Sequence, residues 1–205
     1  MVLKKIAVTG GLQSGKSTLC QMFQEWGATT VSLDQIVHQL ISQGKDQNKE
    51  LVEQIIALLG DEIKTDGTID RKKVAHIVFQ NPQKLATLEA LIHPVVRKEL
   101  FRLYEKAVES RASLFVVEEP LLFELENSFP IEWYDATIAI SCPEEIAISR
   151  SHLSADEYKK RMKQQLSQQE KQARATFYID NQGTKDMLYN NAQAVFHKIS
   201  KLQGE

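Results

Sequence analysis

The sequence lacks the features that mark membrane, secreted or disulfide-rich proteins. Its 205 residues include two cysteines, Cys20 and Cys142, which do not have metal-site spacing and are too few for a disulfide framework. No apolar run approaches the length of a transmembrane helix, and the N-terminus lacks the apolar run and small-residue cleavage site of a signal peptide. We therefore expect a cytoplasmic protein with no membrane partner, in which both thiols are reduced and buried.

Charge of one sign is also lacking, as are repeats and low-complexity segments. The formal net charge is −2, and no basic surface pattern with interleaved aromatic residues is present, so we expect no nucleic acid as partner. Pro/Gly-rich linkers are absent. A chain of 205 residues is long enough for one well-buried core but short for two full domains, so a single domain with a small inserted lobe is expected.

Short apolar runs alternate with helical patterns along the chain. Strands are predicted at residues 6–8, 29–33, 114–117, 136–140 and 177–179. Helical patterns are predicted at residues 16–26, 35–41 and 47–59, from 82 onward, from 144 onward, and near 188–202. Asp66-Gly67 is predicted to form a turn, and Asp70 to cap the short helix that follows. Pro94 is predicted to break or kink the long helix at His93. Strands separated by helices predict a five-stranded parallel sheet flanked by helices, with ligands beyond the carboxyl ends of its strands.

The strongest motif lies between the first predicted strand and the first predicted helix. Residues 10–17 read Gly-Gly-Leu-Gln-Ser-Gly-Lys-Ser and match G-x-x-x-x-G-K-[ST], the phosphate-binding loop. Glycines let consecutive backbone N–H groups face inward as an anion nest, and the following helix directs its positive end to the same place. Lys16 is suited to the β- and γ-phosphates, and the Ser17 hydroxyl to Mg²⁺. The motif therefore predicts binding of ATP or a similar nucleotide with Mg²⁺.

Three further features bear on what the loop serves. The guanine-binding motif N-K-x-D is absent. Asp34 follows the second predicted strand, where a carboxylate can accept the proton of an attacking hydroxyl, although it is equally suited to capping the next helix. A basic stretch runs from Lys159 to Arg174, and it is interpreted either as a lid over ATP or as a solvated helix face.

The sequence resembles the dephospho-CoA kinase family over nearly its whole length. The resemblance rests on the following segments: Thr9–Thr18, Asp34, Leu91-Ile92-His93-Pro94, Pro120-Leu121-Leu122-Phe123-Glu124, Arg161 with Gln165, Lys171, and Ile179-Asp180-Asn181-Gln182-Gly183. The phosphate loop is shared by many families, whereas the His-Pro and Pro-Leu-Leu-Phe-Glu segments in this order are more particular. The resemblance implies transfer of phosphate from ATP to the ribose 3′-hydroxyl of 3′-dephospho-CoA.

The resemblance also implies roles for individual residues. Asp34 would be the general base, Lys16 would bind the transferred phosphate, Arg161 would stabilise charge from the lid, and Ser17 would hold Mg²⁺. The residues implied in nucleotide binding are Gly11, Leu12, Gln13, Ser14, Gly15, Lys16, Ser17, Thr18, Arg150, Asn181 and Gly183. Those implied at the acceptor site are Asp34, His93, Pro120, Leu121, Leu122, Phe123 and Glu124. Other readings stay open, with His93 as a helix cap, Glu124 as a surface carboxylate and Phe123 as a core residue.

The implied fold is a P-loop kinase with a helical acceptor-binding insertion at about residues 44–110 and a helical lid at about 152–175. The chain departs from the family pattern at Gln13, where a glycine is usual, at Ser32, where an aspartate is usual, and at Ile146, where an arginine is common. Glu118 stands where many members have aspartate. Two alternatives therefore remain, a kinase for another small molecule such as a nucleoside monophosphate, and a non-catalytic ATP-binding protein. A monomer or weak oligomer is expected.

Overall fold

The computed structural model describes residues 2–42, 48–124 and 130–202 and divides the chain into two compact units. Residues 1–32 and 104–205 form the first unit, and residues 33–103 form the second. The second unit includes most of the predicted insertion but begins earlier, at Leu33. The predicted first boundary, near residue 44, lies outside the described residues.

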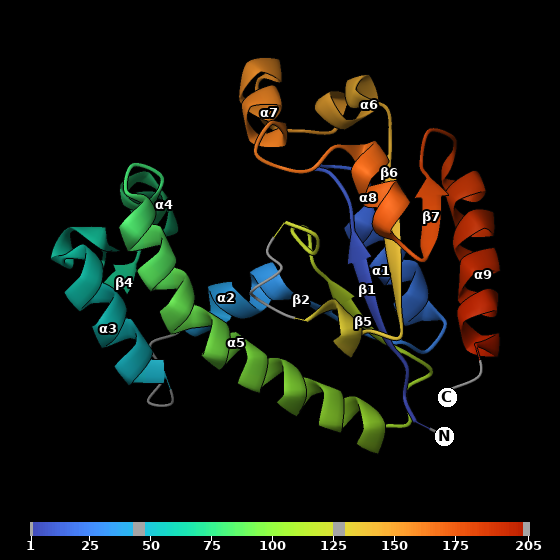
Figure 1. The fold of residues 1–205 in the computed structure, drawn as a ribbon, viewed down its shortest axis with the longest axis horizontal. Helices are drawn as coiled ribbons and strands as arrows, with labels where there is room; N and C mark the ends of the chain where they lie inside the picture. Colours follow the sequence, from blue (N-terminus) through green and yellow to red (C-terminus); the bar gives the residue numbers. More distant parts are fainter. Residues whose placement is uncertain (1, 43–47, 125–129, 203–205) are drawn as a thin grey trace. The chain divides into compact units, whose positions relative to one another are not determined.

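The first unit is built on a parallel sheet, as predicted (Figure 1). Its strands are β1 (Lys5–Thr9), β2 (Thr29–Ser32), β5 (Phe115–Glu118), β6 (Ala136–Ser141) and β7 (Phe177–Asp180), in the spatial order β2-β5-β1-β6-β7. All four strand pairings are parallel, and the register pairs Val8 with both Glu118 and Ile138. β1 is therefore the central strand, and the loop that follows it opens at the middle of the carboxyl edge.

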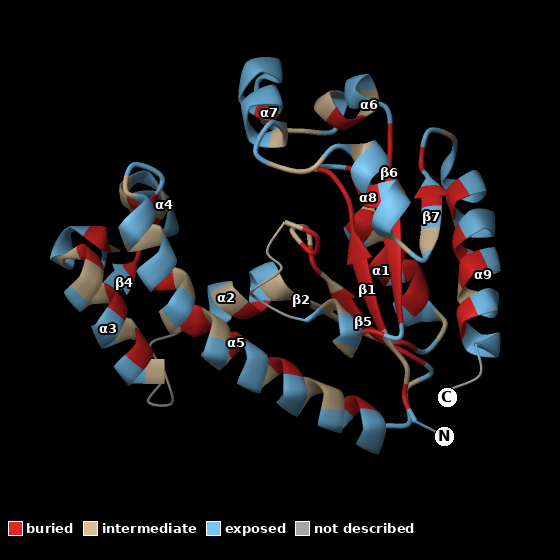
Figure 2. Ribbon diagram, viewed as in Figure 1, coloured by how far each residue is buried: buried red, intermediate tan, exposed pale blue. Residues whose placement is uncertain are grey.

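The helices of the first unit are α1 (Lys16–Glu25), α6 (Glu144–Ser149), α7 (Ala155–Met162), α8 (Gln168–Arg174), α9 (Lys185–Lys201) and the last residues of α5 (Pro82–Glu109), with a 3₁₀ turn at Ile131–Trp133. Of these, α1 and α9 pack together against the sheet. The buried residues of α9 form a stripe that faces the sheet (Figure 2). Leu188, Ala192, Val195 and Ile199 recur at intervals of three or four residues, which is the spacing of one helical face.

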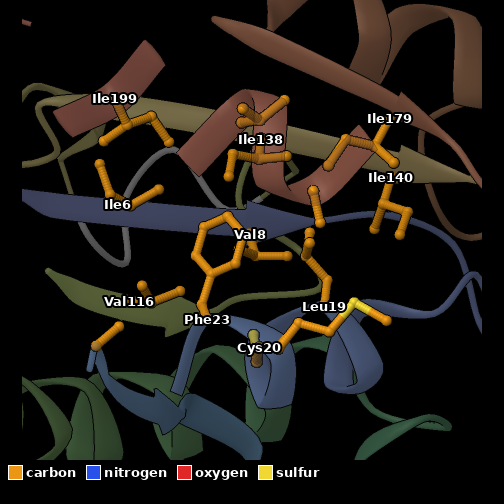
Figure 3. Packing of buried hydrophobic residues seen from close by; sticks show 14 of the residues in the cluster. Ile6, Val8, Leu19, Cys20, Phe23, Val116, Ile138, Ile140, Ile179 and Ile199 are labelled. Atoms are coloured by element: carbon orange, nitrogen blue, oxygen red, sulfur yellow. The ribbon is translucent and has the colours of Figure 1, made fainter. Parts of the chain in front are cut away.

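The main core lies between one face of this sheet and helices α1 and α9 (Figure 3). Alternate residues of the central strands, among them Val8, Val116 and Ile138, pack against Phe23 of α1. The ring of Phe23 meets that of Phe196 of α9 edge-on at 5.2 Å between centroids. Strand side chains alternate between the two faces of the sheet, and those on the opposite face are buried as well. There the ring of Tyr104 of α5 lies 5.4 Å from that of Phe115, measured between centroids.

The second unit is mostly helical. It contains α2 (Leu33–Ser42), α3 (Lys49–Leu59), a 3₁₀ turn at Asp61–Ile63, α4 (Arg71–Val78) and most of α5. The turn predicted at Asp66-Gly67 closes a small antiparallel hairpin of β3 (Lys64–Thr65) and β4 (Thr68–Ile69), two strands that were not predicted. The predicted cap of α4 is confirmed, since the Asp70 carboxylate accepts hydrogen bonds from the backbone N–H groups of Lys72 and Lys73.

The predicted break of the long helix at Pro94 is wrong. α5 runs through this residue for 28 residues without a break. A proline inside a helix removes one backbone donor, and this local cost is offset by packing. Leu88, Ile92, Val96 and Leu100 are spaced by four residues and are all buried, so the helix keeps one apolar face on both sides of Pro94.

Within the described parts of the chain, no helix is long and apolar enough to span a membrane.

Candidate active site

The phosphate-loop motif occupies the predicted position. β1 ends at Thr9, α1 begins at Lys16, and the loop between them lies at the carboxyl end of the central strand. Its first and last glycines are required by close packing. A Cβ atom on Gly10 would lie 2.1 Å from the backbone oxygen of Ile140, and one on Gly15 would lie 2.4 Å from Nδ2 of Asn181. Both glycines have positive φ angles, 152° and 106°, which side-chain-bearing residues rarely adopt.

Gln13 also has a left-handed backbone, with a φ angle of 58°. Its side chain is exposed at the tip of the loop. A nest of inward N–H groups alternates right-handed and left-handed residues, so Gln13 takes a conformation that the loop requires and that glycine adopts at lower cost. The departure of Gln13 from the family pattern thus changes the stability of the loop and leaves its path intact.

We expect Gln13→Gly to raise the free energy of unfolding by about 1 kcal/mol, because the left-handed conformation costs a non-glycine residue roughly 1–2 kcal/mol and the greater chain entropy of glycine offsets part of the gain. Urea denaturation measures this difference. Gln13→Ala is the matched control, since alanine keeps the strained conformation while losing the same exposed amide. Equal stability of the glycine and alanine variants would contradict the explanation.

Lys16 and Ser17 begin α1 at the mouth of the loop. The Lys16 ammonium is buried and donates hydrogen bonds to the backbone oxygens of Gly10 and Gly11, at 3.0 and 2.8 Å. It therefore lies across the loop, near where the motif would place the phosphates. The Ser17 hydroxyl is exposed and donates to Oε1 of Glu118 at 2.9 Å. Thr18 follows on the first turn and is partly exposed.

Glu118 contacts the loop but was not predicted to belong to the site. It is the last residue of β5, which pairs directly with β1, so its carboxylate reaches the start of α1. The signal was available in the sequence, because an acidic residue directly followed a predicted strand, but strand order was needed to place it beside Ser17. The serine hydroxyl and the carboxylate are oxygen donors of the kind that Mg²⁺ prefers, and Mg²⁺ typically keeps several waters rather than a full protein cage. Among the residues described, no cluster of three or more His, Cys, Asp or Glu side chains suited to a metal occurs.

Glu119, the next residue, faces the other side of the sheet. Its side chain is buried and accepts a hydrogen bond of 2.7 Å from the Tyr134 hydroxyl. Burial raises the pKa of the Glu119 carboxyl from 4.5 to about 7, and the hydrogen bond opposes this only in part. Between these two values the carboxyl is protonated in the folded protein, whereas an unfolded glutamate is ionised.

This shift predicts a pH dependence of stability. A carboxyl whose pKa is raised on folding stabilises the folded state below its unfolded pKa, and the contribution is lost as pH rises through the folded pKa. Between pH 4.5 and about 7 we expect Glu119 to lower the free energy of unfolding by about 3 kcal/mol. Glu119→Gln should remove this fall in urea denaturation curves, whereas Glu132→Gln, at an exposed position, should keep it. A Glu119→Gln protein with the same fall would refute this assignment.

The segment after Glu119 is tied to the loop and to α8. The Thr9 hydroxyl and the Lys171 ammonium both donate to the backbone oxygen of Pro120, at 3.1 and 2.8 Å. Pro120 and Leu121 are partly exposed, whereas the side chains of Leu122 and Phe123 are buried, at 0% and 3% exposure. Of the four apolar residues that the resemblance implied at the acceptor site, the structure leaves Pro120 and Leu121 accessible and places the other two in the core.

Glu124 is part of a buried ion pair. Its Oε1 atom lies 2.8 Å from the Lys171 ammonium, and the two side chains are 12% and 2% exposed. The same oxygen accepts the backbone N–H of Leu166, and Arg174 donates to the backbone oxygen of Phe123. Burial lowers the pKa of Lys171, and the hydrogen bond and charge of Glu124 oppose that shift. These contacts join the segment after β5 to α8 and to Leu166, shortly before that helix begins.

The predicted lid, residues 152–175, contains α7 and α8. Ser154 and Ser167 begin these helices with reciprocal capping boxes to Glu157 and Glu170. On α7, Tyr158 is buried and its hydroxyl donates to the backbone oxygen of Leu12. Arg161 lies on the exposed side of the same helix, and Arg150 is exposed at the end of α6. Two basic residues implied by the resemblance are therefore accessible near elements that contact the loop.

Asn181 lies beneath the loop rather than at its rim. It is 5% exposed, and its amide donates to the backbone oxygen of Ser14 at 2.9 Å. Gly183, two residues later, is partly exposed in the β7–α9 connection. The adenine contact implied for this connection remains a prediction, and the structure adds a direct link from Asn181 to the phosphate loop.

Asp34 and His93 belong to the second unit. Asp34 is the second residue of α2, two positions after β2 ends at Ser32 opposite Glu118. Its side chain is exposed. His93 is partly buried in α5, and burial lowers the pKa of its imidazole, which favours the neutral ring. The roles implied for both residues at the acceptor site remain predictions.

Comparison with known proteins identifies the family. The family model described as dephospho-CoA kinase matches residues 4–186. This chain belongs to the dephospho-CoA kinase family. A dephospho-CoA kinase from Protochlamydia amoebophila is 34% identical over 203 residues, which are 96% of this chain and 97% of that protein.

Solved structures agree with this assignment. The dephospho-CoA kinase from Campylobacter jejuni superposes with a TM-score of 0.68 at 27% identity, covering 96% of this chain and 97% of its own. The protein TT1252 from Thermus thermophilus superposes with a TM-score of 0.80 at 31% identity over the full length of both chains. The fold is thus that of a P-loop kinase of the dephospho-CoA kinase family, as the sequence predicted.

Proposed function

We propose that this protein transfers the γ-phosphoryl group of ATP to the ribose 3′-hydroxyl of 3′-dephospho-CoA, giving CoA and ADP, the last step of coenzyme A biosynthesis. The observation that carries the proposal is the dephospho-CoA kinase family match over residues 4–186, which includes an intact phosphate loop between β1 and α1. Catalysis in phosphoryl transfer is mainly positioning and electrostatic stabilisation, so the proposal depends on where charge and hydrogen-bond donors lie.

The loop supplies the phosphate site. Its backbone N–H groups and the N-terminus of α1 would hold the phosphates, with Thr18 beside them on the first helical turn. Lys16 would exchange its hydrogen bonds to Gly10 and Gly11 for the β- and γ-phosphates, which are stronger acceptors because they are charged. Ser17 and Glu118 would hold Mg²⁺, which when bound neutralises charge on the phosphates.

The acceptor side is proposed from the resemblance and from chain connectivity. Asp34 would accept the proton of the 3′-hydroxyl as that oxygen attacks phosphorus. The resemblance assigns His93, Pro120, Leu121 and Glu124 to contacts with the acceptor. Arg161 on the lid would stabilise charge on the transferring group, and Arg150 and Gly183 would adjoin the adenine. We propose that the protein acts in the cytoplasm as a monomer or weak oligomer.

A coupled ADP-release assay tests the proposal. With ATP, Mg²⁺ and dephospho-CoA, we expect ADP to form at a rate that depends on the acceptor, and removal of Mg²⁺ by a chelator should abolish it. Parallel reactions contain a nucleoside monophosphate or no acceptor. Rapid ADP release with the monophosphate and none with dephospho-CoA would reject the proposed acceptor. ATP binding without ADP release under any condition would instead indicate a non-catalytic ATP-binding protein.

A further inference from the structure

Three successive backbone oxygens of the phosphate loop are each bound from outside the loop by a side chain. The Leu12 oxygen accepts from the Tyr158 hydroxyl at 3.1 Å, and the Ser14 oxygen accepts from Nδ2 of Asn181 at 2.9 Å. Between them, the Gln13 oxygen accepts from Sγ of Cys142 at 3.7 Å. The three donors come from α7, from the β6–α6 connection and from the β7–α9 connection, so separate parts of the first unit converge on three consecutive peptides.

All three donors are buried. Tyr158, Cys142 and Asn181 are 1%, 2% and 5% exposed. Tyr158 and Cys142 share an apolar cluster with Ala147, and Leu12 and Met162 pack against it. Burial raises the pKa of the Cys142 thiol and raises that of Tyr158 to about 12, so both groups keep the protons that they donate. Buried donors held in this way have little freedom to turn to water, so the three bonds restrain the loop.

Restraining a backbone oxygen also restrains the next N–H group. The peptide unit is planar and trans, so the C=O of one residue and the N–H of the next point in opposite directions. Bonds that hold the oxygens of Leu12, Gln13 and Ser14 outward therefore turn the N–H groups of Gln13, Ser14 and Gly15 toward the other side of the loop, where that of Ser14 donates to the Gly11 oxygen at 3.3 Å. These are the central amides of the motif that cradles phosphate.

We propose that Tyr158, Cys142 and Asn181 are positioning residues that hold the amides of the phosphate loop in the orientation that binds a polyphosphate. The proposal rests on the proposed function, since it concerns the ATP site of that reaction. It assigns Asn181 a role on the phosphates through the backbone of Ser14, in addition to the adenine contact implied by the resemblance. It also makes α7, a helix of the predicted lid, a direct support of the loop, because Tyr158 joins the two.

Tyr158→Phe tests the proposal with the smallest change, because it removes the hydroxyl and keeps the buried ring. We expect the Kd values for ATP and for inorganic tripolyphosphate, measured by calorimetry, to rise by the same factor of about 3 to 10, the loss of one hydrogen bond. In the ADP-release assay, KM for ATP should rise while KM for dephospho-CoA stays unchanged. A merely structural role would not produce this split.

Tyr104→Phe is the matched control. The Tyr104 hydroxyl also donates to a backbone oxygen, that of Leu3, at the same distance of 3.1 Å, but at the far end of β1 from the loop. Both variants lose a tyrosine hydroxyl bonded to a backbone oxygen. We therefore expect similar changes in their free energies of unfolding, with weaker tripolyphosphate binding in Tyr158→Phe alone.

Asn181→Ala separates phosphate positioning from adenine contact. Tripolyphosphate has no base, so a residue that acts only on adenine would not affect its Kd. We expect Asn181→Ala to weaken tripolyphosphate by about 3- to 10-fold, as for the loss of the Tyr158 hydroxyl. If wild-type protein binds tripolyphosphate, and Tyr158→Phe and Asn181→Ala bind it as tightly as wild type, the positioning role is rejected while the proposed reaction stands. If wild-type protein binds neither ATP nor tripolyphosphate, the proposed reaction and the positioning role both fail.

Discussion

Asp34→Asn is expected to lower kcat for dephospho-CoA by about 10²- to 10⁴-fold, the usual contribution of a general base, while the Kd for ATP stays unchanged. Asparagine keeps the size of the side chain and its capacity for hydrogen bonds but cannot accept the proton of the 3′-hydroxyl. ATP binding should be preserved because the phosphate loop lies on β1 and α1, away from Asp34 in the chain. Stopped-flow or steady-state ADP release gives kcat, and calorimetry gives the Kd.

Asp186→Asn is the matched control for the alternative reading of Asp34 as a helix-stabilising residue. Asp186 is the second residue of α9, as Asp34 is of α2, so both carboxylates lie in the first turn of a helix. Each substitution is expected to cost about 0.3–1 kcal/mol in helix-dipole interaction. The rate should fall only for Asp34→Asn. Full activity of Asp34→Asn would remove the base assignment and leave Asp34 as a helix-terminal residue.

Lys171→Met is expected to lower the free energy of unfolding by about 3–5 kcal/mol, because it leaves the Glu124 carboxylate buried without its partner. The Lys171 and Glu124 side chains are 2% and 12% exposed and lie 2.8 Å apart. Methionine retains most of the length of lysine, so the loss arises mainly from the charge and from the hydrogen bond to Pro120. Urea denaturation, with activity measured on the folded fraction, distinguishes lost stability from lost catalysis.

The double variant Lys171→Met/Glu124→Leu provides the internal check. Replacing both members of a buried ion pair by apolar residues is often nearly neutral, so the double variant should recover most of the stability lost by either single variant. Lys64→Met is the exposed control. Its ion pair with Asp61 has side-chain exposures of 37% and 81%, and losing it should cost at most about 1 kcal/mol. Additive losses in the double variant would mean that the two charges do not stabilise each other.

Much of the fold could be predicted because its local signals agree with one another. Buried strands were recognised as short apolar runs, and their five positions match the observed sheet. Asp70 was recognised as a helix cap from its residue type and place. Pro94 shows where such reasoning fails, because four buried residues spaced along α5 outweighed a single local signal. Propensity acts over a few residues, whereas packing sums over a whole helical face.

The catalytic motif and the family could likewise be inferred without coordinates. Gly10, Gly15, Lys16 and Ser17 belong to one short motif whose chemistry follows from their spacing, because the motif is contiguous and its backbone path is local. The His-Pro and Pro-Leu-Leu-Phe-Glu segments added the acceptor, and the family match agrees with that inference. The sequence alone therefore determined the fold class, the phosphate loop and the family.

Only the tertiary structure placed the groups that surround this loop. Glu118 meets Ser17 because β5 lies beside β1, and Lys171 meets Glu124 because α8 returns to the end of β5. Tyr158 and Asn181 reach successive backbone oxygens of the loop from positions 146 and 167 residues away in the sequence. No spacing rule links residues so far apart, since their distance depends on strand order and helix packing. The chain by itself determined what binds phosphate, and the folded protein decided what holds that site in place.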